Sequence, residues 1–160
     1  MFLPNVDSRT RTYLLDEFQR DVNAGRLHVP MDLTKEGTGD WPVLLQLTLM
    51  ESGPDALAQH LRHRGRMRDP RKAIALAHAE YRRLYCRAIC RRAIDDGQPE
   101  VQVIGPKQGG PARIEARSLL GALRAFPDTP AGLPGLPNTE AVVAIPDVNS
   151  DVNQKSTLAA

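Results

Sequence analysis

The run DPRKAIALAHAEYRRLYCRAICRRAIDDG, residues 69–97, decides the fold because it has the pattern of one long amphipathic helix. Asp69 can cap this helix, Pro70 suits its first turn, and Gly97 is the residue type that most often ends one. Between these signals, apolar residues recur at helical spacing and predict an inward stripe over residues 70–96. The stripe comprises Ile74, Ala77, Tyr81, Leu84, Tyr85, Ala88 and Ile89. We expect this helix to be the spine of the domain.

Three shorter helices are predicted before the spine. The first covers residues 9–24 and ends at Gly25, and the third runs from Pro54 through Leu61. The second starts at Asp40 and ends at Ser52-Gly53, and its mostly apolar composition predicts a place in the core. The apolar residues of the first two helices are Leu14, Leu15, Phe18, Val22, Leu44, Leu45, Leu47 and Leu49. Between these two helices, the alternation in residues 26–29 predicts a short strand with Leu27 and Val29 inward, and residues 31–40 are expected to form a loop.

The second half of the chain contains less helix. Residues 100–104 alternate as a half-buried strand does, and the glycines and prolines of 105–111 favour a loop. A last helix is expected over residues 113–125. The fold class predicted is therefore α+β, mainly α-helical, with about five helices and one or two short strands in a domain spanning residues 1–126. Residues 127–160 carry five prolines and no helical periodicity, which predicts an extended, Pro-rich C-terminal arm.

Composition excludes some classes of protein. The longest apolar stretches are Val43-Leu44-Leu45 and residues 141–145, far short of the roughly 20 residues that span a bilayer. The first sixteen residues lack the basic and apolar regions of a signal peptide. We therefore expect an intracellular protein in a reducing compartment, with no membrane contact.

Two cysteines, Cys86 and Cys90, lie four residues apart and so share one face of the long helix. A zinc site would need further ligands such as His78, His60 or His63, because zinc in structural sites takes four. Buried free cysteine more often serves as a small hydrophobic residue, and that interpretation is favoured here. We expect no metal and no cofactor.

A nuclease site is the enzymatic alternative. The segment from Glu100 to Lys107 is similar to a strand on which carboxylates hold Mg²⁺ near a lysine, but its second acidic position is Gln102. Asp95 and Asp96 fit the end of a helix. The sequence therefore predicts no catalytic residues and no enzyme, with a metal-dependent nuclease left open.

The net charge of +2 conceals a strong asymmetry. Residues 62–92 carry eleven basic side chains against Asp69 and Glu80, and arginine supplies most of them. Arginine forks suit phosphate or carboxylate partners, so this segment is a candidate surface for nucleic acid or an acidic partner. Its candidate residues are Arg62, Arg64, Arg66, Arg68, Arg82, Arg83, Arg87 and Arg91. Pairing with the acidic remainder of the fold, or with a neighbouring subunit, is the favoured alternative.

The arm suggests a partner of another kind. Residues 127–160 cannot bury enough apolar surface to order themselves, so we expect another chain to hold them. In this interpretation Val142, Val143 and Ile145 form a subunit-binding segment that adds to an exposed sheet edge of a neighbour.

A resemblance points in the same direction. Residues 80–94, the following segment through Val103, and residues 13–18 resemble small uncharacterised proteins of phage and prophage gene clusters. The resemblance implies a role in a virion, made in the host cytoplasm before assembly. We therefore expect a structural virion protein, such as a head, decoration or head–tail connector component. It would bind copies of itself or other virion proteins through its arm, and possible contact with packaged DNA is part of this expectation. The alternative is a nucleic-acid-binding accessory protein that uses the arginine-rich 62–92 segment.

Overall fold

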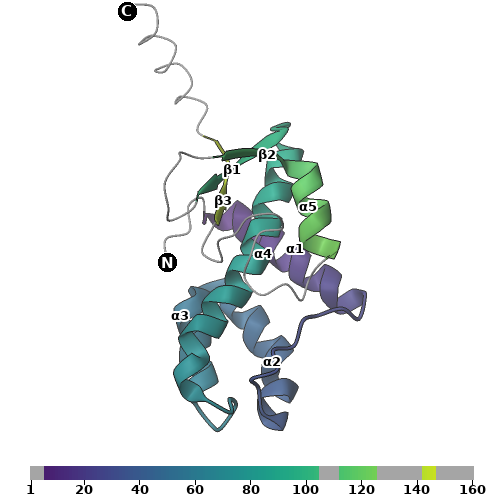
Figure 1. Ribbon diagram of the computed structural model, residues 1–160. Helices are drawn as coiled ribbons and strands as arrows, with labels where there is room; N and C mark the ends of the chain where they lie inside the picture. Colours follow the sequence, from purple (N-terminus) through teal and green to yellow (C-terminus); the bar gives the residue numbers. More distant parts are fainter. Residues whose placement is uncertain (1–5, 105–111, 126–141, 147–160) are drawn as a thin grey trace, which may run out of the picture.

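The computed structural model describes residues 6–104, 112–125 and 142–146, and these form a mainly helical α+β fold (Figure 1). The helices are α1 (Ser8–Asn23), α2 (Lys35–Leu47), α3 (Gly53–Arg62), α4 (Ala73–Asp95) and α5 (Ala116–Ala125). The strands are β1 (Glu100–Ile104), β2 (Ala112–Glu115) and β3 (Val142–Ala144). The predicted fold class is therefore confirmed for the described part of the chain.

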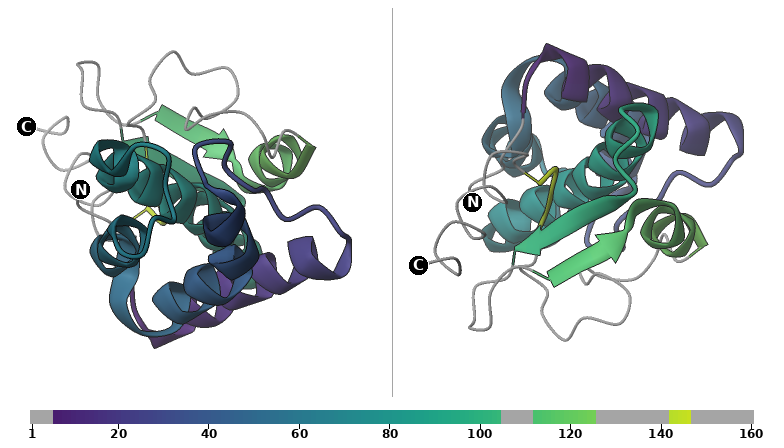
Figure 2. Two further views of the ribbon diagram at one scale, coloured as in Figure 1. Left: turned by 90° about the horizontal axis from the view of Figure 1, so that it is seen from below. Right: turned by 90° about the horizontal axis from the view of Figure 1, so that it is seen from above.

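Helix α4 is the spine that residues 69–97 predict. Asp69 accepts a hydrogen bond from the Arg71 backbone N–H, and the 3-10 turn η2 (Pro70–Lys72) leads into α4. Helices α1, α3 and α5 pack on α4, and the right-hand view of Figure 2 shows α4 lying between α1 and the sheet. One predicted stripe residue, Ile74, does not face inward: its side chain is 48% exposed in the first turn of α4.

Helix α2 begins earlier than the sequence predicts. Thr34, and not Asp40, caps it by accepting a hydrogen bond from the Gly37 backbone N–H. Gly37 packs closely on the connection between α3 and α4. A Cβ added to Gly37 would lie 2.0 Å from the Arg66 carbonyl oxygen. The predicted loop over residues 31–40 is therefore wrong from Lys35 onward, because the cap lies at Thr34 and Gly37 packs closely on Arg66.

The predicted strand over residues 26–29 is also wrong. These residues form an irregular connection between α1 and α2, and Val29 is exposed. A strand needs a neighbour for its backbone groups, and here the His28 carbonyl instead accepts a hydrogen bond from Trp41 Nε1 at 2.8 Å. The alternation of Leu27 and Val29 therefore does not correspond to a strand of the sheet.

Strand β1 confirms the prediction for residues 100–104 and lies at the centre of the sheet, paired antiparallel with β2 and with β3. Its buried residues Val101 and Val103 face α4, so the sheet packs one face on the core. Residues 112–115, which include the predicted start of the last helix, form β2, and α5 begins only at Ala116. The Ala116 N–H donates to the Pro99 carbonyl at 2.8 Å, which fixes that start beside the beginning of β1.

Strand β3 lies within the segment that the sequence predicts as an extended arm. Val142 pairs with Ile104 of the same chain, Val143 is completely buried in the chain's own core, and Ile145 packs against that core. Of the proposed subunit-binding segment, Val143 and Ile145 thus complete the chain's own fold, because β1 offers them a free edge. Residues 127–141 and 147–160 lie outside the described residues, as does the side chain of Val142.

The core runs through the contacts between α4 and the elements around it. Its largest members include Trp41, Tyr85, Leu14 and Leu84, all completely buried. Helix α2 contributes Leu44 and Leu45, but its Leu47 is 46% exposed, contrary to the prediction of a wholly buried rod. In the parts of the chain that the structure describes, no helix has the length and hydropathy to cross a bilayer.

Candidate functional site

Arg87, in the middle of α4, makes a buried ion cluster with two acidic residues of α1. Only 1% of its surface is exposed. Its Nη1 and Nη2 atoms donate to the Asp21 carboxylate at 2.9 and 2.7 Å, and its Nε donates to Glu17 Oε2 at 2.9 Å. Such a two-pronged geometry is the strongest form of ion pair available to arginine. Arg87 therefore joins α4 to α1 and is not available to an external partner.

Two further arginines converge on Glu17, which is itself completely buried. Arg124 of α5 donates from Nε to Glu17 Oε2 at 3.3 Å and also from Nη2 to Oε1. Arg91 lies 3.8 Å from Glu17 and 3.5 Å from Asp16, and its guanidinium stacks over the Tyr13 ring. The cluster thus joins α1, α4 and α5 around one carboxylate.

The cluster keeps Glu17 ionised. Burial alone would raise the pKa of Glu17, but the hydrogen bond from Arg124 and the charges of Arg87 and Arg124 outweigh it, so the pKa is lowered. Burial likewise acts to lower the pKa of Arg87, and the hydrogen bonds and charges of Asp21 and Glu17 reverse this and raise it. Both groups are therefore charged at neutral pH and hold one another in the interior.

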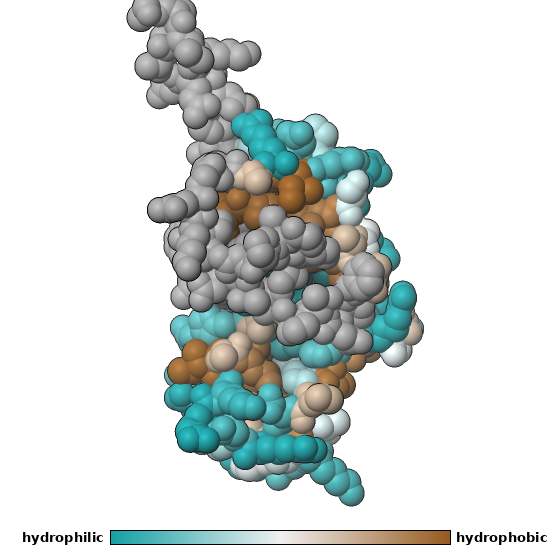
Figure 3. Space-filling model, viewed as in Figure 1, coloured by the Kyte–Doolittle hydropathy of each residue, from teal (hydrophilic) through white to brown (hydrophobic). Residues whose placement is uncertain are grey.

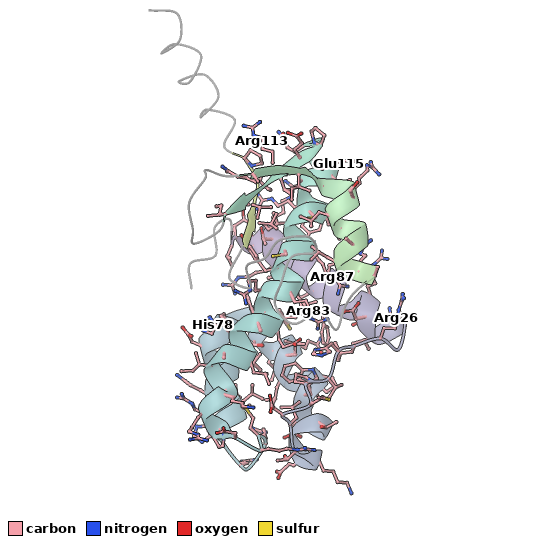
Figure 4. The ribbon with its side chains drawn as sticks, in the orientation of Figure 1. Arg26, His78, Arg83, Arg87, Arg113 and Glu115 are labelled. Atoms are coloured by element: carbon pink, nitrogen blue, oxygen red, sulfur yellow. The ribbon has the colours of Figure 1, made fainter. Side chains whose placement is uncertain are left out.

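The remaining paired arginines of α4 also bond within the chain. Arg83 donates to Glu80 at 2.8 Å, and Glu80 is 2.8 Å from His28 Nδ1 (Figure 4 labels Arg83 and Arg87 along α4). Arg92 donates to both Asp7 and Thr10 at the start of α1. Of the arginine face that the sequence predicts on α4, this pairing accounts for Arg83, Arg87 and Arg91, as the favoured alternative expected. Arg82 is partly buried on α4 and makes no ion pair with the described residues.

The acidic partners Glu17 and Asp21 were missed by the sequence analysis, although a signal exists for them. They lie three and seven residues after Leu14, on the same helical face as the apolar residues of α1. Arg87 likewise lies among the buried residues of α4. Opposite charges placed on two apolar stripes predict a buried pair wherever those stripes face each other.

The other half of the basic segment lies at one end of the molecule, between α3 and α4. Arg62 and Arg68 are exposed, and so is Arg64, whose φ of 59° lies in the left-handed region. These three side chains form no ion pair or hydrogen bond with the residues the structure describes, although the backbone of Arg68 does. Arg66 differs, because it donates from Nε to Asp40 at 2.9 Å and from Nη1 to the His60 carbonyl. The structure therefore pairs most arginines of α4 within the chain and leaves Arg62, Arg64 and Arg68 open to solvent.

The cysteines lie where small hydrophobic residues belong. Cys86 and Cys90 are both buried, and burial raises the pKa of Cys86 to about 11 and that of Cys90 further. Within the described ranges, no group of three or more His, Cys, Asp or Glu side chains is arranged to hold a metal ion. Asp95 accepts a hydrogen bond from Tyr13 and Asp96 pairs with Arg9, so both acids near the predicted nuclease strand have structural partners. Lys107 lies outside the described residues.

An apolar surface forms the second candidate site. Val43, Leu47 and Met50 are 60%, 46% and 46% exposed, and their spacing of four and three residues places them along one outward side of α2 and its π-helical continuation η1 (Thr48–Ser52). Gly39 precedes them by one turn, and no atom lies within 4 Å of the position its Cβ would take. We name Val43, Leu47 and Met50 the α2 stripe.

Comparisons of this chain with protein-family models, with curated proteins and with solved structures find no match. The assignment of a function therefore depends on the two surfaces just described.

Proposed function

We propose that this protein is a structural, non-enzymatic subunit of a phage particle, such as a head, decoration or head–tail connector component, and that its α2 stripe joins it to another copy of the chain. The observation that carries the proposal is the exposure of three large apolar side chains on one side of a helix. Single exposed apolar residues are ordinary on protein surfaces, but a continuous group indicates an interface.

The form of the stripe suits contact between two copies. Gly39 leaves room beside it for a second backbone to approach closely. A two-fold symmetric contact would bring each stripe against its own counterpart, which is the commonest arrangement in homo-oligomers. Because β3 pairs within its own sheet and Val143 is buried there, we place the contact between copies at the α2 stripe and not at the Val143 segment.

Self-association tests this proposal. The full chain is expected to form dimers or larger species as its concentration rises, measured by sedimentation velocity. Leu47→Glu introduces an unpaired charge into the centre of the stripe. Because burying that charge opposes association, the substitution should raise the dissociation constant of the dimer at least tenfold.

The control is Ile74→Glu, which adds the same charge at a residue of nearly equal exposure, 48% against 46%, on a different helix. It should leave association unchanged. A wild-type chain that stays monomeric throughout the concentration range contradicts the proposal, and so does an equal effect of both substitutions.

The phage assignment rests on the resemblance of residues 80–103 and 13–18 and has its own test. Mass spectrometry of purified particles should find the protein at a fixed ratio to the major head or tail proteins. Abundant protein in the producing cells together with none in the particles contradicts a virion role and favours an accessory role.

A further inference from the structure

The open half of the basic segment is a second surface, separate from the α2 stripe. The relevant residues lie at the end of the molecule where α3 ends and where α2 and α4 begin (Figure 1), an end that is predominantly hydrophilic in Figure 3. We name this group, which consists of Arg62, Arg64, Arg68, Arg71 and Lys72, the basic end. From its geometry we propose that the basic end binds the phosphate backbone of duplex nucleic acid.

Positive charge exceeds negative charge at this end. Three of its acids are paired, Asp40 with Arg66, Asp69 with Arg71, and Asp32 with Lys72, while Glu36 in the first turn of α2 makes no ion pair with the described residues. Arg62, Arg64 and Arg68 then remain as three positive charges without an acidic partner among the described residues. On α4, by contrast, Arg83, Arg87, Arg91 and Arg92 all have acidic partners within the chain. Within residues 62–92, the exposed arginines that lack an acidic partner among the described residues therefore all lie at this end.

Hydrogen bonds hold in place the backbone that presents these arginines. The Thr34 N–H donates to the Arg66 carbonyl at 2.9 Å, and the Thr34 hydroxyl donates to the Gly65 carbonyl at 2.7 Å. The Arg68 N–H donates to the Asp32 carbonyl at 2.9 Å. A fixed backbone reduces the entropy lost when the side chains bind a ligand.

Arg64 occupies a position where the fold favours glycine or asparagine. A φ of 59° costs an ordinary residue about 1 kcal/mol relative to glycine. Arg64 has no partner among the described residues that would offset this strain. Contact of Arg64 with a partner outside the chain would offset this cost.

The composition of the basic end selects the partner. A protein interface has an apolar or aromatic centre, whereas the only large apolar residue of 62–72 is Met67, which is buried and bridges to Leu33. Residues 62–72 include no Phe, Tyr or Trp side chain on which unpaired bases stack, and His63 is their one aromatic ring. Arginine with few apolar or aromatic neighbours suits the regularly spaced phosphates of a duplex.

Fluorescence anisotropy with a short labelled DNA duplex tests the inference. The variant with Arg62→Ala, Arg64→Ala and Arg68→Ala removes three phosphate contacts. The slope of log affinity against log salt concentration should therefore become less negative by about 2.7. Between about 50 and 200 mM salt, wild-type affinity should therefore fall about 40-fold more than that of the variant.

The control variant removes the same charge elsewhere, through Arg20→Ala, Arg26→Ala and Arg117→Ala, three exposed arginines outside the basic end (Figure 4 labels Arg26 far from it). It should retain most of the wild-type affinity and salt dependence. Equal losses in both variants, or none in the basic-end variant, overturn the inference, as does wild-type protein that does not bind the duplex at about 50 mM salt.

Poly-glutamate and single-stranded DNA of equal length distinguish the partner. The wild type should bind the duplex more tightly than poly-glutamate and at least as tightly as the single strand. Equal or tighter binding of poly-glutamate would assign the basic end to an acidic protein instead. None of these results depends on self-association through the α2 stripe, because Leu47→Glu should leave duplex binding by the monomer intact.

Discussion

At the scale of single residues, the buried pair of Arg87 and Asp21 shows how this chain uses charge. Removing one member of a buried ion pair leaves the other without a partner in a medium that solvates it poorly. Loss of Arg87 leaves Asp21 without its ion-pair partner and removes one of the arginines that surround Glu17.

We therefore expect Arg87→Met, which keeps most of the side-chain volume, to lower the free energy of unfolding by about 3–5 kcal/mol. Urea denaturation followed by circular dichroism measures this. Arg117→Met, on an exposed part of α5, is the control and should change stability by less than about 0.5 kcal/mol. An Arg87 variant as stable as the control would show that the cluster contributes nothing to folding.

The same cluster predicts a response to acid. The pKa of Glu17 is lower in the folded state than its ordinary value of about 4.3, so its contribution to stability is complete above that value. The contribution is lost as pH falls through the lowered, folded-state pKa. Melting temperatures between pH 2 and 7 should therefore fall less steeply below about pH 4 for Glu17→Gln than for the wild type. Parallel curves contradict this role for Glu17.

The cysteines predict a chemical result at the same scale. Because burial raises the pKa of Cys86 to about 11 and encloses both thiols, neither should form the reactive thiolate in the folded protein. A colourimetric thiol reagent at pH 8 should react with both only after denaturant is added. Rapid reaction of the native protein would place a thiol at the surface.

At the scale of elements, α2 shows what sequence patterns predict and where they fail. The patterns predict the long α4, the strand β1 and the apolar side of α2 that contains Leu44 and Leu45. They place the cap of α2 at Asp40, six residues after Thr34, because the contact of Gly37 with Arg66 depends on a segment about thirty residues away. A local pattern contains no information on such a contact.

Two glycines of α2 provide a matched test of that explanation. Gly37→Ala would place a Cβ 2.0 Å from the Arg66 carbonyl oxygen and should destabilise the fold by about 1–3 kcal/mol. Gly39→Ala meets no atom within 4 Å and should stabilise the helix by about 0.5–1 kcal/mol. Denaturant unfolding of the two variants measures both effects. The same sign for both would contradict the observed packing of α2.

At the scale of the whole molecule, the sequence predicted the fold class but not how the arginines are divided. Residues 62–92 form one basic block in the sequence, whereas the fold brings acidic residues of α1 beside its second half only. That outcome depends on how α1 packs against α4, which no single segment specifies. In the same way, Val143 appeared to be part of an arm because its strand partner, β1, lies about forty residues earlier in the chain.

The central claim is that the arginines of α4 stabilise the fold while those of the basic end are free to bind a partner. The most direct test compares the free energies of unfolding of two variants that lose the same charge. Arg83→Ala with Arg87→Ala and Arg91→Ala should lose more than about 3 kcal/mol or fail to fold. Arg62→Ala with Arg64→Ala and Arg68→Ala should stay within about 1.5 kcal/mol of the wild type. Equal losses in the two variants would contradict the claim.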